Sequence, residues 1–464
     1  MRVSVWPLVI VILTLPALGY RQPVARARSS GTPVVKPVAG GVQWLTHPRK
    51  GICKGKQVGR APLIVVSMHG AIYTITADGR NLCRITDYAM PRPNASPPGY
   101  ANTIGAASNP HLSPTGRQIA YLTTTSTDSH DVWIVPTEGA TGGPRRLTMT
   151  SRTVDRAAPS WSPGGRFLAY HEGNPAGKGS PASYAGASVV VRRIDGSRFA
   201  TVLRLKFAVK GSPNAFSFGQ DGPAIAWSPD GRKIATIIGF VPGPSYPVGL
   251  NVGIATIRTG HTRTVTIRFP KGILTRAPSS PKQFPPFGSF PSGDGLAWTA
   301  DSRHLVISTI GRGAGGSLTG LWRVAQTGGI AQLFVGTQSD IKEHMPASPV
   351  VNGATGFLFS PNLRRLATDP DNRFWVAGAS GQHGHFTNTY IPRGCVLAQY
   401  TWLPDSSGLA YVTECTVPSS GSILLRLNLY TVKLGASPRP SLGVIDREPD
   451  ALDLAPARRC VACG

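Results

Sequence analysis

The stretch AWSPDGRKIATII, residues 226–238, decides the fold because the chain repeats it. In each copy an apolar or aromatic residue precedes Ser-Pro-x-Gly-Arg or a variant of it, and an alternating apolar run follows. Two close copies are HLSPTGRQIAYLT at 111–123 and SWSPGGRFLAYHE at 160–172. Weaker copies are AWTADSRHLVIST at 297–309, LFSPNLRRLATDP at 358–370 and TWLPDSSGLAYVT at 401–413. Such internal repetition indicates a repeat architecture.

The repeated phrase has the chemistry of a tight turn between two antiparallel strands. Proline presets φ at the first corner, a polar residue caps the turn, and glycine takes the left-handed position that closes it. We therefore interpret three glycines as turn residues rather than phosphate-binding glycines: Gly116, Gly165 and Gly231. The weaker copies have other residues near this place, and we expect their turns to be reshaped: Ser302, Leu363 and Ser406.

Tryptophan stands directly before the turn in several copies, as Trp161, Trp227, Trp298 and Trp402. A large aromatic side chain at one equivalent position of a repeat is typical of packing between neighbouring sheets. We favour this interpretation over a ligand-binding role for the tryptophans.

The rest of each unit predicts further strands. A second β pattern and a short turn follow the phrase, as in DVWIVPTEG from residue 131, and a third run ends several units, as in PRRLT from residue 144. The segment 62–86 carries the later strands of such a unit, with its first strand unclear. Units of this kind predict an all-β fold, a β-propeller of about seven four-stranded blades. Six blades would result if the first segment merged with the last.

Composition agrees with a chain of short strands and turns. The 464 residues include 54 glycines and 42 prolines, with 41% hydrophobic and only 15% charged residues. This mixture argues against a coiled coil, a helical bundle, a doubly wound α/β enzyme and wholesale disorder.

The N-terminus reads as a targeting segment. Arg2 precedes an apolar run over 3–18, and small residues follow it, which is typical of a secretory signal peptide cleaved after Gly19 or Ala27. An uncleaved membrane anchor is the alternative. The predicted organisation is a signal peptide or anchor at 1–19, a Pro/Gly-rich segment at 20–61, the propeller at 62–445 and a tail at 446–464. We expect an exported protein that is secreted, periplasmic or associated with the cell wall.

The six cysteines fit an oxidising compartment and structural disulfides. The last turn centres near Asp405, and Cys395 and Cys415 each lie ten residues from it, so they should face each other across the hairpin. Cys53 with Cys83 would tie the preceding segment to the first blade. Cys460 with Cys463 would close a small loop, and a link from either of these two to Cys53 is an alternative. A redox site or a zinc site has less support.

The pattern W-S-P-D-G-R-x-I-A resembles the TolB-type, WD40-like propeller repeat of bacterial envelope proteins. Similar blades occur in the propellers of prolyl oligopeptidase-like peptidases. The resemblance covers residues 62–442 and implies the fold rather than a function. TolB carries an N-terminal α/β domain where this sequence has only the segment 20–61, so the Tol–Pal role is not carried over. The peptidases carry a hydrolase domain with a G-x-S-x-G motif, which this sequence does not show.

Long insertions fall mostly on one side of the predicted propeller, where second-to-third-strand and inter-blade loops lie. Binding sites are most common on a face that carries the long loops. These loops combine aromatic and cationic residues, which binding surfaces favour. The predicted binding residues are Tyr88, Arg92, Tyr100, Phe216, Phe218, Phe240, Tyr246, Arg276, Lys282, Phe284, Phe287 and Phe290. The alternative is that the aromatic residues pin their own loops.

The net charge of +26 favours an anionic partner. Nucleic-acid-binding motifs are absent, so we expect an envelope protein or an anionic cell-wall polymer, no nucleic acid, and membrane contact only through an uncleaved N-terminus. A compositional bias explains the charge about as well. We expect a monomer.

Catalytic patterns are weak, so we predict a non-catalytic binding protein without a cofactor. His383 and His385 are the only close histidine pair, and Asp369 and Asp371 flank a turn. Ca²⁺ binding has no motif, although scattered carboxylates could provide oxygen ligands, namely Asp128, Asp131, Asp155, Asp221, Asp294 and Asp301. The alternative is a propeller enzyme of the lactonase or polysaccharide lyase type, with a metal at the central channel.

Overall fold

The computed structural model describes residues 63–68, 70–77, 83–86, 107–126, 129–137, 143–148, 155–173, 188–195, 198–206, 225–241, 249–269, 295–309, 312–313, 316–317, 320–336, 357–368, 373–387, 389–419, 422–435 and 443–446. The chain divides into two compact units, Met1–Pro37 and Val38–Gly464, and every described residue belongs to the second. The described residues form strands and turns, and none of them builds a helix capable of crossing a membrane.

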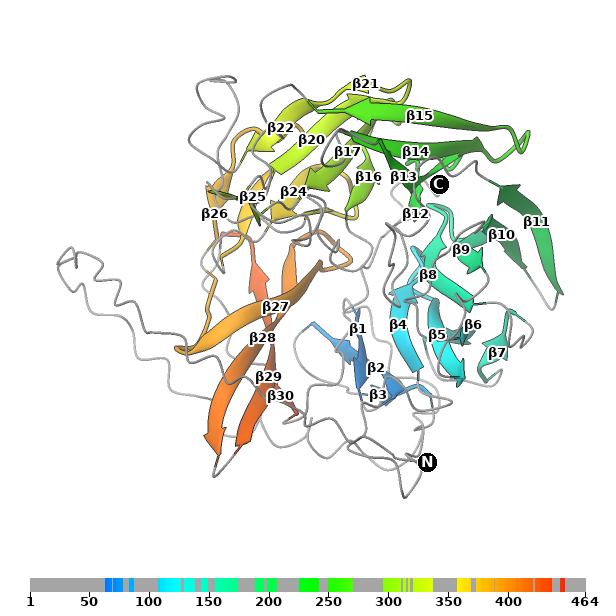
Figure 1. Cartoon of the computed structure of the whole chain (residues 1–464). Helices are drawn as coiled ribbons and strands as arrows, with labels where there is room; N and C mark the ends of the chain where they lie inside the picture. Colours follow the sequence, from blue (N-terminus) through cyan, green and yellow to red (C-terminus); the bar gives the residue numbers. More distant parts are fainter. Residues whose placement is uncertain are drawn as a thin grey trace, which may run out of the picture. The chain divides into compact units, whose positions relative to one another are not determined.

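The strands form a series of small sheets that follow one another in chain order (Figure 1), and we call these sheets blades 1 to 7. Blade 1 contains β1 (Leu63–Met68), β2 (Ala71–Thr76) and β3 (Cys83–Arg84). Blade 2 contains β4 (Ala107–Leu112), β5 (Gln118–Ser126), β6 (Ser129–Pro136) and β7 (Arg145–Arg146). Blade 3 contains β8 (Asp155–Trp161), β9 (Phe167–Gly173), β10 (Ser188–Asp195) and β11 (Arg198–Lys206). Blade 4 contains β12 (Ile225–Trp227), β13 (Lys233–Val241), β14 (Gly249–Thr256) and β15 (Thr262–Arg268).

The remaining blades repeat the same antiparallel order. Blade 5 contains β16 (Leu296–Trp298), β17 (His304–Thr309), β20 (Gly320–Ala325) and β22 (Gln332–Gly336). Blade 6 contains β23 (Phe357–Phe359), β24 (Arg365–Thr368), β25 (Trp375–Gly378) and β26 (His385–Phe386). Blade 7 contains β27 (Cys395–Trp402), β28 (Gly408–Ser419), β29 (Ser422–Lys433) and β30 (Gly443–Asp446). Two short strands, β18 (Arg312–Gly313) and β19 (Gly316–Ser317), pair with each other, and β21 (Gly329–Ile330) joins β15 in parallel.

Blade 1 carries the later strands of the unit, as its sequence predicts. The Ile72 N–H donates to Thr86 Oγ1 (2.9 Å), and the Val132 N–H donates to Thr148 Oγ1 (3.0 Å) in the same way in blade 2. The strands β2 and β3 therefore correspond to β6 and β7, the third and fourth strands of blade 2. The described part of blade 1 contains its second, third and fourth strands.

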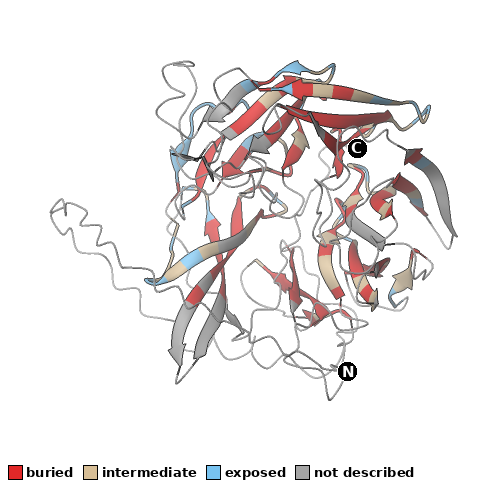
Figure 2. Ribbon diagram, in the orientation of Figure 1, coloured by how far each residue is buried: buried red, intermediate tan, exposed pale blue. Residues whose placement is uncertain are grey.

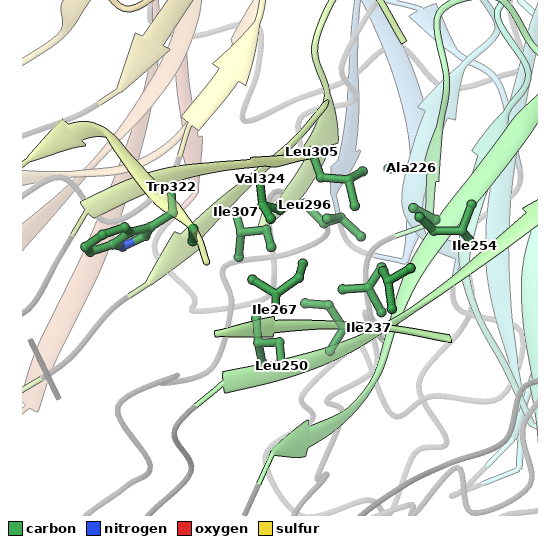
Figure 3. Close-up of a cluster of buried hydrophobic side chains, with 14 of the residues drawn as sticks. Ala226, Ile237, Leu250, Ile254, Ile267, Leu296, Leu305, Ile307, Trp322 and Val324 are labelled. Atoms are coloured by element: carbon green, nitrogen blue, oxygen red, sulfur yellow. The ribbon is translucent and has the colours of Figure 1, made fainter. Parts of the chain in front are cut away.

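Buried residues, red in Figure 2, recur in the strands of every blade, and their apolar side chains form clusters between one blade and the next. The largest cluster lies between blades 4 and 5, where Ile237, Leu250 and Ile267 meet side chains of β16, β17 and β20 (Figure 3). Similar clusters join each of the other consecutive pairs. Burial of apolar area at these interfaces supplies about 25 cal/mol per Å² towards folding.

Blade 7 packs directly against blade 1 and closes the ring. Val412 and Leu429 share a buried cluster with Ile64 and Tyr73, and the Thr431 hydroxyl donates to the carbonyl of Ala77 (3.4 Å). The first and last sheets remain separate, so the alternative of six blades is wrong and the propeller has seven. Among the described strands, side-chain packing rather than a shared strand makes this closure.

The tryptophans before the turns lie between neighbouring blades, as predicted. Each is buried and donates its indole N–H to a carbonyl in the preceding blade. The bonds are Trp161 to His111 (2.9 Å), Trp227 to Ser160 (3.2 Å), Trp298 to Ala226 (3.0 Å) and Trp402 to Leu358 (3.0 Å). The ring is thus held together by both apolar contact and a repeated hydrogen bond.

The turns after these tryptophans have one geometry throughout. The N–H of the left-handed residue donates to the carbonyl three residues earlier, at Gly116 (2.8 Å), Gly165 (2.8 Å), Gly231 (2.8 Å), Ser302 (2.9 Å), Leu363 (2.7 Å) and Ser406 (2.9 Å). The φ angles of these residues are 70°, 66°, 67°, 56°, 58° and 60°. The glycines are turn residues, as predicted. The expectation of reshaped turns at Ser302, Leu363 and Ser406 is wrong.

Hydrogen bonds explain why residues other than glycine keep this geometry. The left-handed conformation costs a residue with a Cβ about 1–2 kcal/mol. In two of these turns a hydrogen bond to the serine side chain offsets part of that cost. Ser302 Oγ accepts the N–H of Asp230 (3.3 Å), and Ser406 Oγ accepts the N–H of Asn362 (3.2 Å). Both donors lie in the turn of the preceding blade. The side chain of Leu363 has no polar atom to form such a bond and packs instead against the cluster between blades 5 and 6.

We expect Gly165→Ala to lower the free energy of unfolding by about 1–2 kcal/mol, because alanine at a φ of 66° is strained. A Cβ added there would meet its nearest atom, Thr115 Cγ2, at an ordinary 3.5 Å, so the cost comes from the backbone. Gly164→Ala in the same turn is the control, since a Cβ there meets nothing within 4 Å and its φ is not left-handed. Urea unfolding measures both, and equal losses would contradict the assignment.

The predicted disulfide in blade 7 is confirmed. Cys395 and Cys415 are directly paired on β27 and β28, with their Cα atoms 4.0 Å apart, and their sulfurs are bonded. Cys83 is buried in β3. Cys53, Cys460 and Cys463 lie outside the described residues, so their pairing stays a prediction.

Candidate functional site

The blades present two faces with different connections. Turns between the first and second strands, and between the third and fourth, lie at one end of the strands, which we call the turn face. Connections between the second and third strands, and between blades, lie at the other end, which we call the long-loop face. The sequence analysis assigns the predicted binding residues to the long-loop face. All of them except Phe240 lie outside the described residues, and only the backbone of Phe240 is described, in β13 opposite Leu250. Their role stays a prediction.

The turn face carries a row of exposed arginines that are not among the binding residues predicted from the sequence. We call Arg117, Arg166, Arg232, Arg303 and Arg364 the arginine arc. Each directly follows the left-handed residue of its turn in blades 2 to 6, and each is exposed. In blade 7 the same position is occupied by Ser407.

One backbone hydrogen bond fixes the place of every arginine in the arc. The carbonyl of each arginine accepts a hydrogen bond from a backbone N–H at the end of the third strand of the same blade. The donor directly follows that strand, except in blade 3, where it lies within the last residues of the strand. These bonds are Thr137 to Arg117 (3.0 Å), Ile194 to Arg166 (2.7 Å), Ile257 to Arg232 (2.9 Å), Gln326 to Arg303 (3.0 Å) and Ala379 to Arg364 (2.9 Å). The arginines therefore leave the backbone from equivalent positions.

Neighbouring turns also touch one another. A Cβ added at Gly165 would lie 3.5 Å from Thr115 Cγ2, and one at Gly231 would lie 3.9 Å from Pro163 Cδ. These distances place the turns of blades 2, 3 and 4 close to one another, and the hydrogen bond from the Asp230 N–H to Ser302 Oγ joins those of blades 4 and 5. The turns of blades 2 to 5 thus form a continuous row.

Carboxylates in these turns are already engaged. Asp230 Oδ1 accepts the Arg232 N–H (3.0 Å) and the Ser228 hydroxyl (2.5 Å). Asp301 Oδ1 accepts the Arg303 N–H (2.9 Å) and the Thr299 hydroxyl in the same way. Burial raises the pKa of Asp301, but these two hydrogen bonds and the neighbouring His304 outweigh that effect and hold its pKa below the ordinary value. Asp301 therefore remains ionised at neutral pH as the cap of its turn.

The surface described around the arc is rich in cations. Arg193, Arg258, Arg263 and Lys433 are exposed near the turn-face ends of their strands, and Arg263 donates to the Gln326 carbonyl (3.1 Å). Three other carboxylates have described side chains: Asp405 caps the turn of blade 7, and Asp131 and Glu172 pair with Arg146 and Arg204. Each carboxylate whose side chain the structure describes therefore either pairs with an arginine or caps a turn, and none of these carboxylates forms an ion pair with an arginine of the arc.

The residues considered for catalysis or ion binding lie apart. Asp131 is buried in blade 2, and Asp301 caps a turn of blade 5. His383 and His385 are exposed, in the last turn and last strand of blade 6. Within the described ranges, no three His, Cys, Asp or Glu side chains are placed to share a metal ion. Asp128, Asp221, Asp294, Asp369 and Asp371 lie outside those ranges.

The signal for the arc is present in the sequence. Arginine follows the turn residue in five copies of the repeated phrase. Taken one at a time, these arginines read as solvated turn residues. Their importance depends on the side-by-side stacking of the blades, which brings equivalent positions onto one face.

Comparisons with known proteins find distant similarities among solved structures. No family model and no curated protein matches the chain. Among solved structures, TolB from Acinetobacter baumannii is 13% identical over 70% of this chain and 62% of that chain, with a TM-score of 0.37. The β-propeller domain of the Trilobed protease from Pyrococcus furiosus is 13% identical over 72% and 82%, with a TM-score of 0.40. Oligogalacturonate lyase from Vibrio parahaemolyticus is 10% identical over 71% and 75%, with a TM-score of 0.42.

These similarities concern the propeller architecture and no activity. The chain spans less than two thirds of the TolB structure it matches. The strand order and the packing of successive blades establish the fold directly. The chain is a seven-bladed β-propeller.

Proposed function

We propose that this protein is a non-catalytic propeller that binds an anionic polymer of the cell envelope. The observation that carries the proposal is the charge of the described surface. Exposed arginines recur blade after blade on the turn face, while the described carboxylates pair with arginines or cap turns. The whole chain likewise has more basic than acidic residues, with a net charge of +26.

Physical chemistry connects such a surface to an anionic polymer. The guanidinium group presents a planar fork of N–H donors that matches carboxylate and phosphate groups. A field of one sign attracts an oppositely charged polymer and accelerates its association. Single exposed ion pairs contribute only about 0–1 kcal/mol, so useful affinity requires many contacts on one ligand. A polymer supplies those contacts.

The test is the binding of the purified full chain to an envelope extract and to soluble polymers, at low and high salt. We expect retention by anionic polymers that weakens steeply as salt rises, and no retention by an uncharged dextran of similar length. Equal retention by the uncharged polymer would contradict the proposal, and so would binding to one envelope protein alone that persists at high salt.

A further inference from the structure

We propose that the arginine arc is the polymer site and that its ligand is a linear phosphate polymer lying along the turn face. This inference rests on the proposed function and deepens it.

The spacing of the arc favours a chain over a compact anion. Blades are sheets stacked face to face, and stacked sheets lie about 10 Å apart. Equivalent arginines in neighbouring blades are therefore separated by about 10 Å, which exceeds the Debye length of about 8 Å at physiological salt. A single phosphate group can meet one such arginine, whereas a chain with a charge at every repeat meets several in succession.

The part of the arc in blades 2 and 3 has the most favourable local charge. Thr115 and Gly164 occupy the turn position that carries an aspartate in blades 4, 5 and 7. A ligand oxygen arriving between Arg117 and Arg166 therefore meets no carboxylate from either turn.

The chemistry of the arc favours recognition by charge alone. Single-stranded nucleic acids need exposed aromatic side chains on which their bases stack. The tryptophans of these turns are buried between blades, and the exposed aromatics of the described residues, Phe386 and Tyr390, lie on β26 and in the connection after it. A phosphate chain needs only charge and N–H donors, which the arc provides.

Binding of labelled long-chain polyphosphate to the full-length protein tests the site. The arc variant carries Arg117→Gln, Arg166→Gln and Arg232→Gln. The matched control carries Arg268→Gln, Arg373→Gln and Arg393→Gln, which removes the same charge from exposed arginines outside the arc. Thermal unfolding checks that both variants are folded.

We expect the arc variant to bind polyphosphate at least about tenfold more weakly, because it loses three charge-assisted contacts. The slope of log affinity against log salt should fall by about 2, since each phosphate contact contributes about 0.7 on a single-stranded chain. The control should change affinity less than about twofold. Orthophosphate at the same phosphate concentration should not compete, because it spans only one arginine.

Several outcomes would overturn the inference. Equal weakening in the arc and control variants would show that net charge, not the arc, holds the polymer. Arc-dependent binding of polygalacturonate or of anionic phosphatidylglycerol vesicles, without binding of polyphosphate, would assign the site to another ligand. Unchanged polymer binding by the arc variant would refute the site and leave the proposed function standing. Wild-type protein that binds no anionic polymer would refute both.

Discussion

Replacing Trp298 by alanine should lower the free energy of unfolding by about 3–5 kcal/mol, the usual cost of removing a large buried aromatic side chain. Trp298 is 3% exposed and lies in the largest apolar cluster, between blades 4 and 5. Its indole N–H also donates to the Ala226 carbonyl at 3.0 Å. The substitution therefore leaves both a cavity and a buried carbonyl without this donor.

Trp298→Phe separates these two losses. Phenylalanine keeps an aromatic ring between the blades, and Phe359 occupies the equivalent position before the turn of blade 6. We expect this variant to lose about 1–2 kcal/mol, from the missing hydrogen bond and a smaller ring. Urea unfolding followed by circular dichroism measures both variants. Alanine and phenylalanine variants of equal stability would show that the indole ring does not hold the two blades together.

Asp131→Ala should lower the free energy of unfolding by about 2–3 kcal/mol, because the Thr148 hydroxyl and the Arg146 guanidinium, whose side chain is 33% exposed, lose the carboxylate that they bond. Asp131 is 1% exposed. Its carboxylate accepts a hydrogen bond from Arg146 and another from the Thr148 hydroxyl (2.9 Å). Thr148 in turn accepts the Val132 N–H (3.0 Å), so the carboxylate orders the contact between β6 and the end of the blade.

Asp131→Asn is the matched control for this prediction. Asparagine has almost the same shape and still offers an oxygen to Arg146 or Thr148, so it should retain more stability than alanine does. Glu172, which pairs with Arg204 in blade 3, provides a second comparison, because Arg204 is half exposed and can turn to water. If Asp131→Ala and Asp131→Asn both unfold at the wild-type urea concentration, the pair contributes nothing to stability.

Sequence reasoning succeeds where local register decides the structure. The turn near Asp405 fixes which residues of β27 and β28 lie opposite, so the Cys395–Cys415 bridge follows from counting outward. The tryptophans are placed correctly for a similar reason, because their distance from the turn fixes the face of the strand they occupy.

Sequence reasoning fails where contacts between blades determine the local structure. The sequence predicts a reshaped turn at Ser302, but a hydrogen bond from the N–H of Asp230, 72 residues earlier, helps to keep the ordinary turn geometry. No local pattern reveals this partner. The arginine arc shows the same limit, since each arginine is visible in the sequence but its neighbours on the turn face come from other repeats.

The way the ring closes bears on how the protein folds. Most blade interfaces join segments that follow one another in the chain, so they can form as those segments become available. The contact between blade 7 and blade 1 joins Thr431 to Ala77, 354 residues apart. Contacts of such long sequence separation carry a large loop-closure entropy and slow the final steps of folding. Blades 7 and 1 should therefore come together last, and their interface should be the first to separate in a partial opening of the propeller.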